Sequence, residues 1–495
     1  MSKYIVSLDQ GTSSCRAVLF NETAQIVDIT QHEFAQHFPK PGWVEHDPME
    51  IWTCQLGVLN ELLMNNGIAG EEIAAIGITN QRETTVVWNK NTGKPVYNAI
   101  VWQDKRTADI CENLIDDWEP IVREKTGLLI NAYFSATKIK WILDNVEGAR
   151  ALAESGDLLF GTIDTWLIWN LTQGQVHATD CSNASRTMLF NINTAQWDDN
   201  LLDALTVPSC MLPTVKDSNA HFGDCHIGGA SVPITGVLGD QQAALFGQLS
   251  WQKGEAKNTY GTGCFLLLNT GDERVISDSG LLTTIAWRMN GHIVYALEGS
   301  VFIAGAAIQW LRDGLRIIDN AQETESLANA ANNDEHVVVV PAFVGLGSPY
   351  WDMDVRGAVF GLSLSSGKAE LARATLESIA FQTYDVLMAM QKDSELQLKT
   401  LKVDGGAIAN NYLAQFQADI LDVIIERPHN LESTATGAAY MAGLGAQFWT
   451  EEFIQQQYRI ESSFIANMPK EKREEHLKRW QKAIVRTRGW LSDSP

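Results

Sequence analysis

Short apolar runs alternate with glycine- and hydroxyl-rich turns at the start of the chain. Residues 4–8 (YIVSL) and 16–20 (RAVLF) have the length and the aliphatic and β-branched content of strands. The intervening residues 9–14 (DQGTSS) hold one carboxylate, one glycine and three hydroxyl side chains. Turn chemistry explains the aspartate and the glycine, but it does not require three consecutive hydroxyl residues. The pattern predicts a β-hairpin with a polar turn.

A related pattern occurs near the middle of the chain. Residues 256–260 lead into Gly261-Thr262-Gly263, and the apolar run 264–268 (CFLLL) follows. This spacing again predicts two strands joined by a Gly/Thr turn. Two such hairpins, about half a chain apart, indicate a duplicated architecture. They predict an N-terminal domain over residues 1–247 and a C-terminal domain over residues 248–495.

The remaining apolar patterns alternate between the periods of strands and helices. Further strands are predicted at 73–79, 84–88, 337–340 and 401–403. Helices are predicted at 371–390, where one apolar face repeats, around 412–420, at 435–447 and near 475–491. Strands that alternate with helices in both halves favour an α/β fold.

Composition and charge exclude several classes of protein. The chain has 495 residues, 45% of them hydrophobic, and a formal charge of −23. Such a charge repels a phosphate backbone, so nucleic acid is not expected as a partner. No apolar run approaches the length of a membrane span, and the first residues do not resemble a signal peptide. With seven scattered cysteines and no Cys-x-x-Cys, neither a disulfide framework nor a zinc ribbon is indicated. We therefore expect a cytoplasmic protein.

A phosphate-binding function would have to use the two hairpin turns. Neither Gly-x-x-x-x-Gly-Lys-Ser/Thr nor Gly-x-Gly-x-x-Gly occurs in the chain. Backbone N–H groups of a glycine-containing turn can converge on an anion. Asp9, at the end of the first predicted strand, could then bind Mg²⁺ through water, because magnesium takes few carboxylates. Two ordinary hairpins remain the alternative.

Three further segments combine polar chemistry with predicted strand ends. Gly405-Gly406 precedes a predicted helix, whose free N–H groups could accept a polar ligand. Arg82 and Glu83 follow the strand 73–79 and could offer donors and an acceptor to a polyhydroxyl compound. Asp240 follows a glycine at the end of an apolar stretch, where it could act as a base or simply cap a helix beginning at residue 241.

Taken together, these segments resemble the FGGY family of carbohydrate kinases, and within it the members that phosphorylate glycerol. The matching segments are 4–20, 40–48, 78–85, 98–103, 133–145, 161–169, 239–247, 258–265, 345–362 and 403–411. The match runs from residue 4 to about residue 447. The resemblance implies an actin-like, ribonuclease-H-like ATPase fold in two domains with a cleft between them. It also implies ATP-dependent phosphorylation of glycerol to sn-glycerol 3-phosphate.

The resemblance also assigns residues to the site. It implies that glycerol contacts Arg82, Glu83, Trp102, Tyr133, Asp240, Gln241 and Phe265, with Asp240 as general base. It implies that the nucleotide contacts Thr12, Ser13, Ser14, Arg16, Thr262, Gly305, Gln309, Gly406 and Asn410. It implies that Asp9 lies beside the bound Mg²⁺. It also implies that the protein forms a homodimer or a homotetramer.

Two alternatives remain at this point. Another FGGY kinase, acting on a sugar or a longer polyol, would share most of these motifs. An actin-like ATPase without kinase activity would share the nucleotide hairpins but would not need a polyol site. Residues 227–233 form a shorter segment than the loop that binds fructose 1,6-bisphosphate in enteric relatives, so weak or absent inhibition by this compound is expected.

Overall fold

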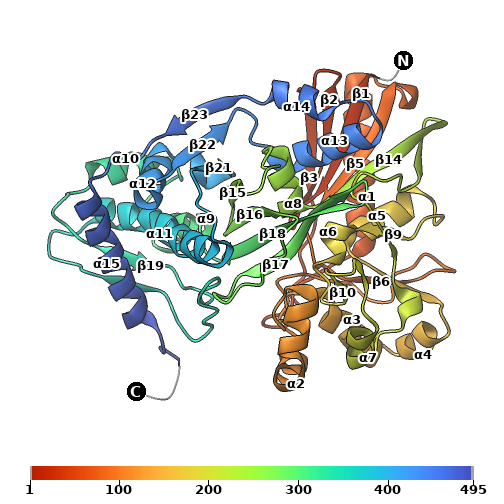
Figure 1. Ribbon diagram of the computed structural model, residues 1–495, viewed down its shortest axis with the longest axis horizontal. Helices are drawn as coiled ribbons and strands as arrows, with labels where there is room; N and C mark the ends of the chain where they lie inside the picture. Colours follow the sequence, from red (N-terminus) through yellow and green to blue (C-terminus); the bar gives the residue numbers. More distant parts are fainter. Residues whose placement is uncertain (1–2, 492–495) are drawn as a thin grey trace.

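The computed structural model describes residues 3–491, and its two largest sheets lie in neighbouring lobes (Figure 1). The first sheet contains β13(Asp224–Ile227), β14(Ala230–Gly239), β5(Ile73–Asn80), β1(Tyr4–Gln10), β2(Ser14–Asn21) and β3(Ile26–Glu33), in that order. The second sheet contains β17(Leu282–Met289), β18(His292–Val301), β16(Cys264–Gly271), β15(Ala256–Tyr260), β21(Thr400–Asp404), β22(Ile424–Pro428) and β23(Ile460–Phe464), in that order. Both predicted hairpins are therefore confirmed, one in each sheet.

The two hairpins occupy equivalent positions in their sheets. β1 pairs antiparallel with β2 and parallel with β5, and β5 pairs parallel with β14. In the second sheet, β15 pairs antiparallel with β16 and parallel with β21, and β21 pairs parallel with β22. This shared connectivity supports the duplicated architecture. The domain boundary between residues 247 and 248 stays a prediction.

Most predicted elements are present, with shifted ends. The predicted helices correspond to α11(Lys368–Ser394), α12(Asn411–Leu421), α13(Ser433–Gly445) and α15(Lys470–Thr487). α15 begins five residues before the predicted start because its first turn is polar and gives no apolar signal. The strand predicted at 84–88 is β6(Val86–Asn89), since the N–H of Thr84 instead donates to the carbonyl of Arg82 in a turn.

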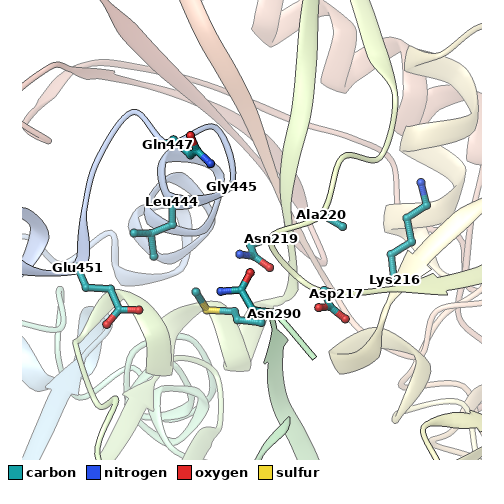
Figure 2. Close-up of a pocket in the computed structure, with 10 residues that line it drawn as sticks. Lys216, Asp217, Asn219, Ala220, Asn290, Leu444, Gly445, Gln447 and Glu451 are labelled. Carbon is teal, nitrogen blue, oxygen red and sulfur yellow. The ribbon is translucent and has the colours of Figure 1, made fainter. Parts of the chain in front are cut away.

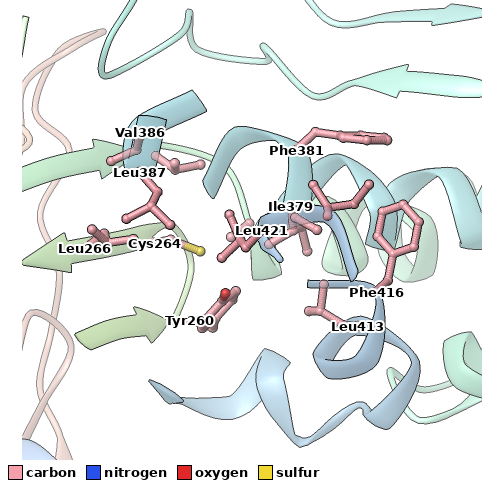
Figure 3. Close-up of a cluster of buried hydrophobic side chains, with 14 of the residues drawn as sticks. Tyr260, Cys264, Leu266, Ile379, Phe381, Val386, Leu387, Leu413, Phe416 and Leu421 are labelled. Atoms are coloured by element: carbon pink, nitrogen blue, oxygen red, sulfur yellow. The ribbon is translucent and has the colours of Figure 1, made fainter. Parts of the chain in front are cut away.

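Each lobe has its own apolar core. In the second lobe, side chains of β15 and β16 pack against α11 and α12, with Tyr260 and Phe416 among them (Figure 3). The buried Tyr260 hydroxyl donates to Oε1 of Gln417 at 2.7 Å, which satisfies its polar end. A separate cluster joins the lobes, because it contains Ile5 and Leu238 from the first sheet and Leu267 and Ala296 from the second.

α13 lies against the first sheet although it follows most strands of the second (Figure 1). It also packs on α8(Asp240–Gly247), which begins directly after β14. A Cβ atom added at Gly437 of α13 would lie 1.8 Å from the carbonyl oxygen of Ala243 in α8. Glycine at this position therefore permits the close contact that fixes α8 on the first sheet.

Two further features of the structure are the state of the cysteines and the composition of the helices. All seven cysteines are free. Over residues 3–491, no helix has both the length and the apolar composition that crossing a bilayer requires.

Candidate active site

The first hairpin turn carries the hydroxyl groups predicted from the sequence. Its backbone is closed by the Gly11 N–H, which donates to the carbonyl of Ser14 at 2.9 Å. Thr12 is half-buried, Ser13 is exposed and Ser14 is buried, where its hydroxyl accepts a hydrogen bond from Gln31. Of these, Thr12 and Ser13 are accessible to an anion approaching the turn. On β2, Arg16 forms an ion pair with Glu432, which immediately precedes α13.

Asp9 lies at the carboxyl end of β1, beside this turn. It is 8% exposed, and within residues 3–491 its carboxylate receives no hydrogen bond. Burial raises the pKa of Asp9 to about 7, although the charge of Arg16 opposes the rise. A buried carboxylate without donors fits a hydrated divalent cation, which would supply the missing positive charge.

The second hairpin turn forms one wall of a cavity of about 240 Å³. Four residues assigned to the nucleotide, Thr262, Gly305, Gln309 and Gly406, line this cavity together with Tyr260, Gly261, Ile308, Arg312, Ala321 and Ala407. The turn is held to α9(Gly305–Gln309) by the N–H of Gly305, which donates to the carbonyl of Gly261 at 3.0 Å. A Cβ atom on residue 305 would lie 2.6 Å from that oxygen, so this approach requires glycine.

Asn410 does not line this cavity. Its side-chain oxygen accepts from the N–H of Leu413 at the start of α12, and its amide nitrogen donates to Thr324. The expectation of open N–H groups at the start of the helix after Gly405-Gly406 was wrong for α12, because the N–H of Asn411 donates to Glu325 and that of Leu413 donates to Asn410. Residues 406–409 form a 3-10 turn before α12 begins. The cavity is instead bordered by Gly406 and Ala407.

Arg82 and Glu83 are enclosed rather than solvated. They follow β5 and are 3% and 1% exposed. Nε of Arg82 lies 3.1 Å from Oδ1 of Asp240, at the start of α8. Glu83 has φ of 60°, in the left-handed region that costs a non-glycine residue about 1–3 kcal/mol. A strained backbone at a buried carboxylate is typical of functional sites.

Three aromatic rings stand beside these charges. Trp102 makes edge contacts with Tyr133, at 5.7 Å between ring centroids, and with Phe265, at 6.3 Å. The indole Nε1–H of Trp102 donates to the hydroxyl of Thr12 at 3.0 Å. This bond connects the aromatic wall to the first hairpin turn, so the two predicted subsites are contiguous.

Asp240 combines a capping contact with access to solvent. Its Oδ1 accepts from the N–H of Gln241 at 2.7 Å, and its side chain is 30% exposed. Burial raises the pKa of Asp240, whereas the charges of Arg82 and Lys257 lower it. Gln241 is buried, and its Oε1 accepts from Nζ of Lys257 at 2.5 Å. That bond assigns the oxygen of the Gln241 amide to Lys257 and leaves its NH₂ group for other partners.

Three charged residues of the site were missed by the sequence analysis: Arg186, Lys257 and Glu298. All are fully buried, and each contacts a predicted site residue. Glu298 directly follows the apolar run 293–297 of β18, a signal that could have singled it out, whereas Lys257 lies beside Asn258 and Thr259 in β15 and gives no such signal. The sequence could not predict which residues these three charges contact. In two of the three cases the contacting residue lies more than a hundred positions away along the chain.

A larger cavity, of about 580 Å³, lies elsewhere (Figure 2). It is bordered by Lys216, Asp217, Asn219, Ala220, Met289, Asn290, Leu444, Gly445, Gln447 and Glu451. None of the predicted site residues lines it, and its walls are mainly polar. The chemistry-bearing residues gather instead around the ends of β1, β5 and β14 and the second hairpin turn.

The arrangement is suited to transferring an anionic group to an alcohol. A carboxylate can accept the proton of a hydroxyl group, while arginine and amide donors hold the other hydroxyls. The two hairpin turns place backbone and hydroxyl donors where phosphate oxygens can bind. Such a site performs phosphoryl transfer mainly by positioning and charge neutralisation.

Comparisons with known proteins agree with this geometry. Glycerol kinases of Fusobacterium nucleatum and Bacillus cereus are 58% and 59% identical over 494 and 495 residues, covering 99% of this chain and 99–100% of theirs. The crystal structure of Plasmodium falciparum glycerol kinase with ADP matches with a TM-score of 0.92 and 37% identity, over 98% of each chain. The N-terminal and C-terminal domains of the FGGY family of carbohydrate kinases match residues 4–247 and 256–446. The chain belongs to the FGGY family of carbohydrate kinases.

Proposed function

We propose that this enzyme transfers the γ-phosphoryl group of ATP to a terminal hydroxyl group of glycerol, which gives sn-glycerol 3-phosphate. The observation that carries the proposal is the placement of Asp240 against Arg82, beside an aromatic wall that is hydrogen-bonded to the first hairpin turn. Relatives named glycerol kinase at 57–59% identity over nearly full length support this substrate. Glycerol is small and polar, and it suits an acceptor site that is lined by charged side chains and three aromatic rings.

We assign the binding of glycerol, the acceptor, to the charged residues around Arg82 and to the three aromatic rings beside them. Arg82, Glu83 and the free NH₂ group of Gln241 hold the hydroxyl groups, and Trp102, Tyr133 and Phe265 cover the carbon chain. A substrate that lacks a hydroxyl group would leave buried donors or acceptors unpaired, which gives discrimination of several orders of magnitude. Selectivity for a small triol then follows from enclosed polar groups rather than from apolar contact.

We assign the nucleotide to the two hairpin turns and the cavity beside the second turn. Thr12, Ser13 and Arg16 contact the phosphates from the first lobe, and Thr262 contacts them from the second. Ser14 would join them once its buried hydroxyl, which accepts from Gln31, turns toward the phosphates. Gly305, Gln309, Gly406 and Asn410 surround the adenosine. Asn410 would contribute after its amide leaves Thr324 or through its backbone, because its side chain is hydrogen-bonded to Thr324 and Leu413. Mg²⁺ bound near Asp9 would neutralise charge on the phosphates.

Asp240 serves as the general base of the reaction. It accepts the proton of the attacking hydroxyl group as the new oxygen–phosphorus bond forms. Burial raises its pKa, which favours uptake of the proton, while the charges of Arg82 and Lys257 limit this rise. Closure of the lobes around both substrates would exclude water, which otherwise competes as the phosphoryl acceptor.

A substrate panel tests the function. We expect purified protein with ATP and Mg²⁺ to phosphorylate glycerol far faster than xylulose, gluconate or ribitol, as measured by release of ADP. Mass spectrometry of the product identifies the acceptor. Rapid turnover of a sugar without turnover of glycerol would favour another carbohydrate kinase. ADP release without any phosphorylated acceptor would favour an actin-like ATPase.

Assembly and location extend the proposal. We infer a homodimer or a homotetramer, which light scattering of the purified protein measures directly. A cytoplasmic location fits the use of ATP and the seven free thiols, which persist in a reducing compartment. A monomer in solution, or export of the protein, would contradict these two inferences.

Replacing Trp102 by Phe tests the link between the subsites. The substitution keeps an aromatic ring over the glycerol carbons but removes the hydrogen bond to Thr12. Loss of one such bond, worth about 0.5–1.5 kcal/mol, predicts a rise in KM for ATP of about 2- to 12-fold. Steady-state kinetics with glycerol held at saturation measures this change.

Trp197→Phe is the matched control, because the Trp197 indole donates to the carbonyl of Pro213 at 2.9 Å away from both subsites. It should leave both KM values unchanged. If Trp102→Phe also leaves KM for ATP unchanged, the hydrogen bond to Thr12 does not help to position the phosphate turn.

A further inference from the structure

A cluster of five charged side chains, four of them buried, spans the two lobes. It contains Arg82, Glu83 and Asp240, which were assigned to the acceptor site, and Arg186 and Glu298, which were not. Glu298 is the only one of the five that comes from the second sheet, where it lies on β18. It is fully buried, so its charge requires partners within the protein.

Glu298 holds both terminal nitrogens of Arg82. Nη1 of Arg82 donates to Oε2 of Glu298 at 2.5 Å, and Nη2 donates to Oε1 at 2.9 Å. A guanidinium group is planar, so fixing two nitrogens in this fork also fixes the direction of the third. That third nitrogen, Nε, is the one that lies 3.1 Å from Asp240. The orientation of Arg82 toward Asp240 is therefore set from the opposite lobe.

The same carboxylate reaches Glu83 through Arg186. Nη2 of Arg186 donates to Oε1 of Glu298 at 2.9 Å, while Nε of Arg186 donates to Oε1 of Glu83 at 2.6 Å. Glu83 needs such support, because its backbone lies in the left-handed region. Both charged residues at the end of β5 are thus tied to one side chain of β18.

The electrostatic state of Glu298 agrees with this geometry. Burial disfavours its ionisation, yet the charges of Arg186 and Arg82 lower the pKa of Glu298 to about 2. It remains a carboxylate throughout the working range of the enzyme. The cluster sets three carboxyl groups against two guanidinium groups, and Glu298 is the one that accepts hydrogen bonds from both arginines.

We propose that Glu298 is a positioning residue for the acceptor substrate, which orients Arg82 and Glu83 from the second lobe and so completes the polyol site only when β18 is docked against the end of β5. The inference rests on the proposed function, since the acceptor is taken to be glycerol. Glu298 itself need not touch the substrate. Its role is to keep the hydrogen-bonding groups of the first lobe in one geometry.

Glu298→Gln tests the proposal with little change in volume. It removes the charge and replaces one acceptor oxygen by an NH₂ group that opposes the guanidinium groups. We expect KM for glycerol to rise by about 10- to 100-fold, as for loss of a charge-assisted hydrogen bond. KM for ATP should change by less than about 2-fold, because no nucleotide contact is altered.

The pH profile of kcat gives a second readout that a merely structural role would not move. Burial and the negative charge of Glu298 raise the pKa of Asp240, whereas Arg82 and Lys257 lower it. Asp9 and Glu83 are the other carboxyl groups nearby. The base must be ionised, so the rate falls as the pH drops through its pKa. Removing the charge of Glu298 should move this acid limb to lower pH.

Asp385→Asn is the matched control. Asp385 is a buried carboxylate of the second lobe that accepts from Tyr350, Trp480 and Gln481, away from the acceptor site. Its replacement should lower the midpoint of thermal unfolding without a selective rise in KM for glycerol. If Glu298→Gln does not fold, the KM for glycerol of the Arg186→Lys variant tests the positioning role instead. Lysine keeps the charge but cannot bridge Glu83 and Glu298 as arginine does, so KM for glycerol should again rise selectively.

The outcomes separate this inference from the proposed function. If the unaltered enzyme turns over another polyol instead of glycerol, the proposed substrate is wrong, and KM for that polyol becomes the readout. If the unaltered enzyme is active and folded Glu298→Gln has an unchanged KM for the acceptor, the positioning role is overturned. Equal rises in both KM values with an unshifted acid limb would also overturn it, because they indicate general distortion.

Discussion

We expect Asp240→Asn to lower kcat for glycerol phosphorylation by about 10²- to 10⁴-fold, the usual contribution of a general base. Asparagine keeps the shape of the side chain and the hydrogen bond from the N–H of Gln241, but it cannot accept the substrate proton. Binding of ATP should persist, because the hairpin turns are unaltered. Steady-state kinetics at saturating substrates measures the first effect, and calorimetry with a non-hydrolysable ATP analogue measures the second.

Asp198→Asn provides the control for a helix-capping aspartate. Asp198 accepts hydrogen bonds from the N–H groups of Asn200 and Leu201 at the start of α7(Asp199–Leu205). Its replacement should alter stability by about 1 kcal/mol or less and leave kcat unchanged. An unchanged kcat in Asp240→Asn would remove Asp240 from the role of base and leave it with the capping role alone.

Gly437→Ala should destabilise the protein by about 3 kcal/mol, the upper end of the usual cost of overpacking. The added Cβ atom would lie 1.8 Å from the carbonyl oxygen of Ala243, so α13 and α8 must move apart. Alanine favours helices over glycine by about 1 kcal/mol, which is too little to offset this clash. Because α8 carries Asp240 and Gln241 at its first turn, kcat should fall together with the midpoint of thermal unfolding.

Gly57→Ala is the matched control for this substitution. Gly57 lies within α1(Pro48–Asn66), and a Cβ atom there would meet nothing within 4 Å. The change should raise stability by about 0.5–1 kcal/mol through helix propensity alone. Opposite shifts in the two variants are therefore expected. A Gly437→Ala protein as stable and active as the unaltered enzyme would contradict the proposed role of the contact between α13 and α8.

The predictable part of the fold consists of elements with strong local signals. β1, β2 and β16 contain short apolar runs beside glycine- and hydroxyl-rich turns, and they form with β15 the two hairpins that the sequence predicts. Element ends were less predictable. The polar first turn of α15 hides its start, and the turn at Thr84 delays the start of β6. These ends depend on capping and turn hydrogen bonds, which the periodicity of apolar residues does not report.

The predictable part of the site depended on resemblance as much as on chemistry. Asp240 and Arg82 each have an ordinary interpretation in the sequence, as a helix cap and as a solvated loop residue. Only their ordered occurrence with the other motifs pointed to a kinase. The structure rejects the solvated alternative for Arg82, because this side chain is 3% exposed and surrounded by carboxylates.

The sequence by itself determined the α/β class, the two hairpins with their polar turns, and the residue types available for phosphate and polyol chemistry. Only the tertiary structure decided which charges meet. The paired charges Arg82, Arg186 and Glu298 lie more than a hundred residues apart along the chain. The local sequence around each of them does not indicate which charge it will contact. Pairing of buried charges follows from how the two sheets pack, since a charge removed from water is tolerated only where that packing supplies an opposite charge.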